Sequence, residues 1–351
     1  MTFEEIRKID PDGMYNLVHG FPQQVEEAVT IGNAAKVNVD VRTIQNIVLC
    51  GLGGSAIGGD LLKSYLAGEL QVPFIVNRHY TLPKFVGKKT LVIISSYSGN
   101  TEETISCYKE AIKRGAKILC ISSGGWVEKT AKQKKHPLIK VPGGPSPRAA
   151  LGYSFFPLLI ALSKLRLIKD KNREIQETLS MLKTKAEEYG DPASSSNKAL
   201  QLAEQLRGRI GVVYSSTERL DAVGTRWRGQ MAENGKSLMW GHVLPEMNHN
   251  ELVGWKALTE QMREMQVFFL RDAEDHPRVA IRMDITKKII GEHTRNITDV
   301  QSEGKSLLTR MFSLVHLGDW VSFYLAILHN EDPMPVKVID HLKNELSKVG
   351  H

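Results

Sequence analysis

Three hydroxyl side chains lie close together in a turn that could bind phosphate. The apolar run from Leu91 to Ile94 is typical of a buried strand, and Ser96, Ser98 and Thr101 follow it at once. Each hydroxyl can donate a hydrogen bond to a phosphate oxygen without adding charge. From this window alone, an ordinary strand-to-helix turn capped by Ser and Thr explains the pattern equally well.

A helix is predicted directly after this turn. Asn100 and Glu103 have the spacing of an N-terminal capping pair, so the helix is expected to begin there, and Ile105, Tyr108 and Ile112 share one face of it. The free N–H groups at a helix N-terminus attract anions, phosphate above all.

Small-residue turns of the same kind follow two other predicted strands. The three turns span residues 51–55, 95–101 and 122–125. In open parallel sheets, ligands bind beyond the carboxyl ends of the strands. Because three such turns would meet at one sheet edge, a phosphate or sugar-phosphate site there is the favoured interpretation.

A second polar region could supply acid–base chemistry. Glu233-Asn234-Gly235-Lys236 is followed by a stretch rich in Asn, Glu and His at 244–251, between Trp240 and Trp255. A carboxylate and an imidazole can exchange protons near neutral pH. The simpler alternative is a polar surface loop, although the flanking tryptophans indicate that part of this region is shielded from solvent.

Other chemistries have weaker support. Gly51-Leu52-Gly53 could begin a dinucleotide fingerprint, but Ala56 stands where a third glycine is usual, so a nicotinamide enzyme is only an alternative. A Walker loop and metal-ligand spacing are absent from the sequence. The three cysteines, Cys50, Cys107 and Cys120, form no C-x-x-C pair and are predicted to be reduced structural thiols. No metal or cofactor is expected.

Composition sets the broad class of the protein. The chain has 351 residues, of which 42% are hydrophobic and 24% charged, with a net charge of +7. No apolar run approaches the roughly 20 residues that span a bilayer, and the acidic, helix-like start lacks a signal-peptide core. We therefore expect a cytoplasmic protein without a membrane partner. The lysines are scattered and no aromatic-interleaved basic patch occurs, so nucleic acid is not expected either.

Strands and helices alternate along both halves of the chain. This pattern predicts an α/β fold with two doubly wound parallel sheets, similar to flavodoxin, in three layers with helical connections. The predicted strands are 46–50, 73–76, 91–95, 117–121 and 138–141, then 210–214, 266–270 and 296–300. The second half resembles a degraded repeat of the first.

The predicted divisions are an N-terminal helical segment at 1–40, a first subdomain at 41–165, a helical bridge at 166–207, a second subdomain at 208–330 and a C-terminal helix at 331–351.

Six short motifs in order resemble the bifunctional phosphoglucose/phosphomannose isomerase family, which is built from two sugar-isomerase (SIS) domains. They are Gly-x-Gly-Gly-Ser at 51–55, Ser-Tyr-Ser-Gly-Asn-Thr at 96–101, Pro-Arg-Ala at 147–149, Glu-Asn-x-Lys at 233–236, Pro-Glu-x-Asn-His-Asn-Glu at 245–251 and Asp-Pro-x-Pro-Val at 332–336. The resemblance covers nearly the whole chain. It implies interconversion of glucose 6-phosphate or mannose 6-phosphate with fructose 6-phosphate through a cis-enediol, without a metal.

The resemblance also implies roles for single residues. Glu233 would be the base that moves a proton between C1 and C2, and Arg148 would stabilise the enediolate. His249 would assist ring opening from the neighbouring subunit of a homodimer, together with a C-terminal lysine, Lys343 or alternatively Lys337. The implied phosphate-binding residues are Gly53, Gly54, Ser55, Ser96, Ser98 and Thr101.

The chain departs from the usual family motifs at three positions. Ala232 replaces a common asparagine, Gly235 a usual alanine, and Met334 a frequent threonine. If that threonine helps the site accept both C2 epimers, activity on the mannose epimer is the part affected. A sugar-phosphate-binding module without catalysis stays an alternative, although it would have no use for a proton-transferring Glu and His.

Overall fold

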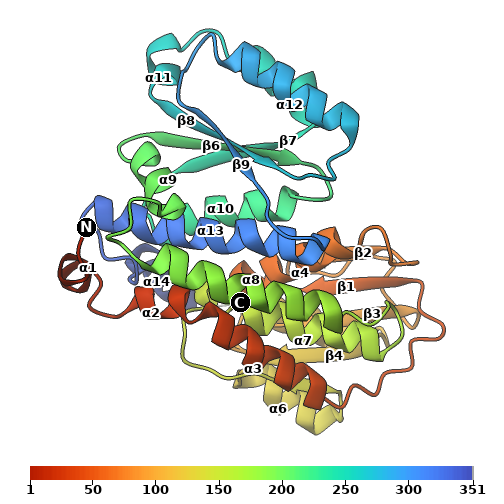
Figure 1. Cartoon of the computed structure of the whole chain (residues 1–351). Coiled ribbons are helices and arrows are strands. Elements are labelled where there is room, and N and C mark those ends of the chain that lie inside the picture. Colours follow the sequence, from red (N-terminus) through yellow and green to blue (C-terminus); the bar gives the residue numbers. More distant parts are fainter. Residues whose placement is uncertain (350–351) are drawn as a thin grey trace.

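The computed structural model describes residues 1–349 and contains two parallel β-sheets with a layer of helices between them (Figure 1). The strands of the first sheet are β1 (Asn46–Cys50), β2 (Phe74–Asn77), β3 (Thr90–Ser95), β4 (Lys117–Ser122) and β5 (Leu138–Lys140). Those of the second are β6 (Ile210–Ser216), β7 (Met239–Leu244), β8 (Met265–Arg271) and β9 (Ile297–Gln301).

The first sheet has the strand order β2-β1-β3-β4-β5, and all its pairs are parallel. This is the flavodoxin-like order, in which the direction of winding reverses between β1 and β3. The predicted doubly wound fold is therefore confirmed. The turns that follow β1 and β3 lie side by side at this reversal, where such folds bind ligands.

The second sheet, β7-β6-β8-β9, is also parallel and repeats the first four strands of the first sheet. No strand was predicted at the position of β7. As an edge strand it leaves Trp240 half exposed and carries Gly241 and His242 in its middle, so it lacks the apolar run of a buried strand.

Helices cover both faces of each sheet. The layer between the sheets holds α3 (Phe21–Ala34), α4 (Gly53–Leu66), α7 (Leu151–Lys164), α8 (Asn172–Gly190), α9 (Lys198–Leu206), α10 (Asp221–Glu233) and α13 (Leu307–Leu328), and one hydrophobic core joins it to both sheets. On the outer face of the first sheet lie α5 (Glu102–Lys113) and α6 (Gly125–Lys134), and on that of the second lie α11 (Thr259–Arg263) and α12 (Pro277–Ile290). All three cysteines are buried and free.

Helix α13 is the central helix of the shared layer. It packs against α8, α9 and α10, and 94% of its most apolar window is buried inside the protein. Its length and hydropathy would suffice to cross a membrane, but a helix that is apolar on every side is equally typical of a protein core. Here other helices of the chain cover its apolar surface, so the helix holds the two halves together.

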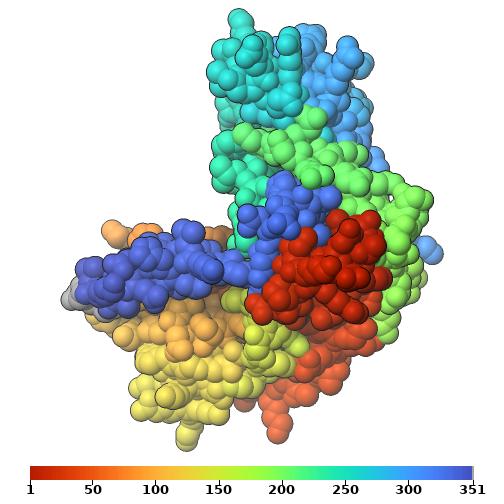
Figure 2. Space-filling view, turned by 90° about the vertical axis from the view of Figure 1, so that its left-hand side faces the viewer, coloured from red at the N-terminus to blue at the C-terminus, as the bar shows by residue number. Residues whose placement is uncertain are grey.

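Short helices lie toward both ends of the described chain. The first are α1 (Phe3–Ile9) and α2 (Met14–His19), and the last is α14 (Lys337–Lys348). Helix α2 packs against α8 and α13. Figure 2 shows the C-terminal segment extending from the body of the molecule across the first subdomain. None of the α14 residues is buried, and Val338, Leu342 and Leu346 are exposed.

Candidate active site

A cleft of about 1000 Å³ lies at the carboxyl ends of β1 and β3. Most of the predicted site residues line it, although they come from distant parts of the chain. They are Gly53, Gly54, Ser55, Ser98, Thr101, Arg148, Glu233 and Lys343. Ser96 and His249 are the two predicted site residues that do not line the cleft.

In the turn after β1, glycines allow another loop to approach the backbone closely, and one hydroxyl is available to a ligand. A Cβ atom on Gly54 would come within 2.3 Å of the Pro147 carbonyl oxygen, so only glycine lets the loop at 147–148 approach. Gly53 has a φ of +50°, which also favours glycine. Ser55 Oγ accepts the Tyr97 N–H at 3.1 Å, which leaves its own proton to donate into the cleft.

The turn after β3 presents two further hydroxyls. The Ser98 hydroxyl accepts the Asn100 N–H at 3.3 Å, and that of Thr101 accepts from Ser96 Oγ at 3.1 Å, so both keep a proton for a ligand. Ser96 itself is buried, and its Oγ also accepts the Gly99 N–H at 3.1 Å. Ser96 therefore orients Thr101 and shapes the turn rather than facing the cleft.

The third turn braces the second one and does not reach the cleft. The Ser123 hydroxyl donates to the Tyr97 carbonyl at 2.6 Å, and a Cβ on Gly99 would collide with the Gly124 carbonyl. The predicted capping role of Asn100 is wrong. Thr101 is the N-cap residue of α5, and Asn100 Oδ1 instead accepts the Trp126 N–H at 3.0 Å, which ties the two turns together.

Arg148 is buried in a short 3₁₀ turn, Pro147–Ala149, with most of its donors engaged. Its Nε donates to Asn234 at 2.6 Å, and one terminal nitrogen donates to the carbonyls of Pro333 and Met334 at 3.0 and 2.7 Å. Burial lowers its pKa, an effect that nearby carboxylates oppose, but a guanidinium stays charged in proteins. The other terminal nitrogen lies 3.7 Å from Glu233 and is left to contact a ligand.

A buried polar network holds Arg148 in place from behind. Arg226 donates to the Arg148 carbonyl at 3.1 Å and forms a two-pronged ion pair with Asp319 at 3.0 and 2.7 Å. Asn234, the acceptor for Arg148 Nε, donates in turn to Ser322 at 3.0 Å. Asn234 belongs to the Glu-Asn-x-Lys motif, but no motif pointed to Arg226, Asp319 or Ser322, because α10 and α13 contribute residues about ninety positions apart.

Glu233 ends α10 and faces the cleft with its side chain about one third exposed. Behind it, Lys236 Nζ donates to the carbonyls of Glu233 and Pro335 at 2.6 and 2.7 Å. Burial, with the nearby charge of Arg148, lowers the pKa of Lys236. Lys236 therefore fixes the loop at 333–335 against the end of α10, so the carboxylate and that loop are held together.

Of the two candidate lysines in α14, the structure favours Lys343. Lys343 lines the cleft together with Ile339 and Asp340, whereas Lys337 is exposed and does not line it. Met334, the departure noted in the last motif, lines the cleft as well.

His249 lies elsewhere in this chain. It ends a 3₁₀ turn, Glu246–His249, just beyond the edge strand β7, and its side chain is exposed. If His249 acts at a cleft, that cleft belongs to another copy of the chain.

Several residues of the cleft were not predicted from the sequence. Helix α2 and the turn before it contribute Asp12, Gly13 and Asn16, for which the sequence offers no motif. Tyr97 could have been found, because it stands inside the Ser-Tyr-Ser motif. Tyr97 lines the cleft, and its buried hydroxyl has no hydrogen-bond partner among residues 1–349.

Within the described part of the chain, no group of three or more His, Cys, Asp or Glu side chains is placed to hold a metal ion. The cleft instead combines neutral hydroxyl donors at one end with a carboxylate and a buried guanidinium at the other. That arrangement can hold an anionic group and move a proton some distance away from it.

Comparisons with known proteins agree with this geometry. Residues 195–346 match the family described as bacterial phospho-glucose isomerase C-terminal SIS domain. The chain is 44% identical to a bifunctional phosphoglucose/phosphomannose isomerase of Caldicellulosiruptor bescii, over 96% of this chain and 99% of that one. It is 40% identical to a protein of the same name from Aquifex aeolicus, over 95% and 98%. The fold is similar to that of a hypothetical protein from Thermus thermophilus, with a TM-score of 0.74 at 16% identity over 99% of this chain and 94% of that one.

Proposed function

This chain belongs to the bifunctional phosphoglucose/phosphomannose isomerase family, and we propose from that premise that its cleft interconverts glucose 6-phosphate and mannose 6-phosphate with fructose 6-phosphate. The chain is an aldose–ketose sugar-phosphate isomerase. One observation supports this assignment most directly: the hydroxyl turns and the Glu233–Arg148 pair line the same cleft.

The phosphate is held at the first-subdomain end of the cleft. Ser55, Ser98 and Thr101 each have a hydroxyl proton free to donate to a phosphate oxygen, and the N-terminus of α4 adds backbone N–H groups. Binding energy from this non-reacting end of the sugar positions C1 and C2 against the catalytic groups.

Glu233 moves the proton between C1 and C2. Its carboxylate removes the proton from one carbon and returns it to the other, with an enediol in between. Negative charge develops on the substrate oxygen during each transfer. Arg148 has one terminal nitrogen without a protein acceptor on the Glu233 side, and this nitrogen can stabilise that charge.

Ring opening requires groups that give and take protons at the ring oxygen and at the C1 hydroxyl. Lys343 of the same chain lines the cleft and is proposed for one of these transfers. His249 is proposed for the other, from a second copy, because it is exposed beyond β7 and does not reach its own cleft. A two-fold homodimer would complete both clefts in the same way.

Proton exchange in D2O tests the isomerase reaction. Purified protein is incubated without added metal with glucose 6-phosphate and, separately, with mannose 6-phosphate, and the products are followed by NMR. Conversion of both to fructose 6-phosphate, with deuterium entering C2 on the return, is expected. Turnover of glucose 6-phosphate alone would restrict the enzyme to one epimer and direct attention to Met334. Saturable binding without exchange would instead indicate a binding module.

Subunit exchange tests the shared site. The variants Glu233→Ala and His249→Ala should each be weakly active alone, and mixing them should restore part of the activity, because one cleft of each mixed dimer then has both groups. Absence of recovery in verified mixed dimers would contradict a shared site.

A further inference from the structure

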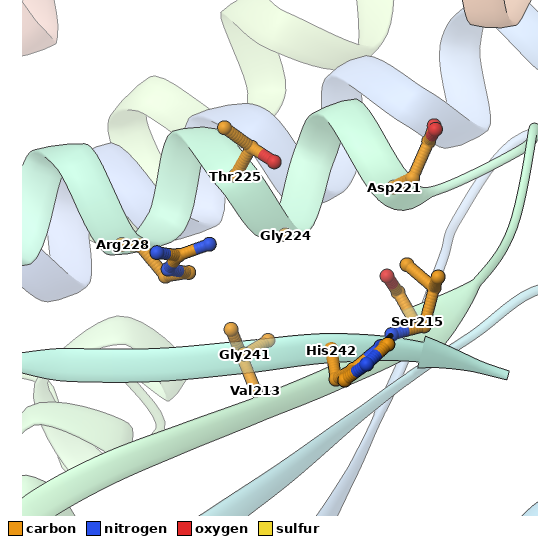
Figure 3. Close-up of a pocket in the computed structure, with 9 residues that line it drawn as sticks. Val213, Ser215, Asp221, Gly224, Thr225, Arg228, Gly241 and His242 are labelled. Carbon is orange, nitrogen blue, oxygen red and sulfur yellow. Dashed lines mark hydrogen bonds between the residues drawn. The ribbon is translucent and has the colours of Figure 1, made fainter. Parts of the chain in front are cut away.

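A second, smaller hollow lies between α10 and the edge strand β7 (Figure 3). Its volume is about 220 Å³, and none of its lining residues lines the cleft. Pockets for drug-sized ligands are about 300–1,000 Å³. This hollow is therefore below the usual size of such pockets and suits a small group.

Two glycines let helix and strand side chains close around the hollow. A Cβ on Gly241 would come within 3.0 Å of Arg228 Cδ, which shows that the Arg228 stem crosses directly over the strand. A Cβ on Gly224 would lie 3.1 Å from Ser215 Oγ, so the Ser215 hydroxyl points up against α10.

The hydrogen-bond donors around the hollow have no protein partners. Ser215 is only 2% exposed, and its hydroxyl has no hydrogen-bond partner among residues 1–349. Thr225 and Arg228 are exposed, and their hydroxyl and guanidinium also have no protein partner within that range. His242 Nδ1 accepts the Val243 N–H at 2.7 Å, which places the proton of the neutral ring on the free Nε2.

The one carboxylate at the hollow is already engaged. Asp221 Oδ1 accepts hydrogen bonds from Ser64 Oγ and from the Ala222 N–H, both at 2.8 Å. Figure 3 shows its side chain turned away from Ser215 and His242. The remaining polar side chains of the hollow are therefore donors, and one of them is a full positive charge.

We propose that this hollow is a second anion site, which binds the phosphoryl group of inorganic phosphate or of a small phosphate ester. Arg228 supplies the charge, and Ser215, Thr225 and His242 supply neutral donors. Hydrogen bonds between charged partners are the strong class of such contacts, and arginine matches phosphate geometry well. Ser215 is the least exposed of these four residues, and its hydroxyl lines the hollow without a protein partner, so its proton is available to a bound anion.

Phosphate binding tests this site in a variant whose cleft binds phosphate less tightly. In the Ser98→Ala/Thr101→Val background, which weakens the phosphate end of the cleft, inorganic phosphate is titrated against the full-length protein and followed by ³¹P NMR. One phosphate is expected to bind per chain. Adding Arg228→Gln should raise the dissociation constant about tenfold or more, and Ser215→Ala should raise it by a similar factor.

Arg173→Gln is the matched control, because it removes the same charge from an exposed position of α8. It should leave the dissociation constant unchanged, and unfolding temperatures close to that of the parent protein would verify the fold of each variant. Failure of the background protein to bind phosphate, or binding that Arg228→Gln does not weaken, would overturn the proposal. Because no substrate is present, this outcome is independent of whether the chain is an isomerase.

Discussion

The two sheets wind in the same way, yet only the first offers an open anion site where its winding reverses. There, the turns after β1 and β3 carry Ser55, Ser98 and Thr101, whose protons are free. At the corresponding place in the second sheet, the turn after β8 carries two carboxylates, Asp272 and Glu274.

The carboxylates of the second sheet are already paired within the chain. Arg310 Nε donates to Asp272 at 2.8 Å, Ser302 Oγ donates to Asp272 at 2.8 Å, and Arg219 donates to Glu274 at 3.0 Å. These carboxylates form ion pairs with the arginines, so the positive charges that would bind a phosphate are already neutralised within the chain. The topology therefore creates a potential ligand site in both sheets, and the side chains at that site determine whether it can bind an external anion. The second subdomain contributes instead through α10, which ends at Glu233, the carboxylate proposed as the base.

The largest effect is expected from removing that carboxylate. Glu233→Gln should lower kcat by about 10²–10⁴-fold, the usual contribution of a general base, and should change KM little because the phosphate turns are untouched. Steady-state kinetics with fructose 6-phosphate measures both. Glu260→Gln, at an exposed carboxylate of α11, is the control. An unaltered kcat in Glu233→Gln would remove Glu233 from its proposed role.

Breaking the internal ion pairs of the second sheet should affect stability instead of catalysis. The Asp272 side chain is fully buried and that of Arg310 is 4% exposed, so Asp272→Asn leaves a buried charge with a weakened partner. The free energy of unfolding should fall by about 3–5 kcal/mol, measured by urea denaturation, with kcat and KM unaffected in the folded protein. Glu292→Gln, at an exposed carboxylate, should have little effect. Wild-type stability of Asp272→Asn would show that the pairs do not hold this turn.

Removing hydroxyls from the first sheet should weaken substrate binding. Each hydrogen bond to a charged group contributes about 1.5–3 kcal/mol, so Ser98→Ala/Thr101→Val should raise KM at least about tenfold, with a smaller change in kcat. Ser216→Ala is the matched control, because that buried hydroxyl ends β6 in the second sheet and has no partner in the described chain. Equal effects of the two changes on KM would contradict the contrast between the sheets.

The smallest effect concerns the helical layer that both sheets share. His316 in α13 is fully buried, and burial lowers its pKa from 6.5 to about 3. The unfolded chain therefore takes up a proton below pH 6.5 that the folded chain does not, so stability is lost as the pH falls through that range. Between pH 7 and pH 5 this amounts to about 2 kcal/mol. Urea denaturation at both pH values should show a smaller loss for His316→Phe, and an equal loss would contradict this account.

Much of the fold could be predicted because its signals are local. The buried strands are short apolar runs, and the predicted strand 46–50 matches β1 at both ends. The strand β7 was missed because an edge strand has no need of such a run. The capping role of Asn100 was wrong because its side chain bonds to a turn 26 residues away, which local spacing cannot show.

Residue order alone was enough to predict the α/β alternation, the hydroxyl turns and, through the ordered motifs, that Glu233 and Arg148 belong to one site, which the cleft they share confirms. Which of those residues meet depends on the packing of the whole chain. That packing turns Ser96 inward, selects Lys343 over Lys337, separates His249 from its own cleft and places Asp319 behind Arg148. The physical reason is that residue types and their local periodicity can be read directly from the sequence. The partners of a buried polar group instead depend on how helices that are distant in sequence pack together.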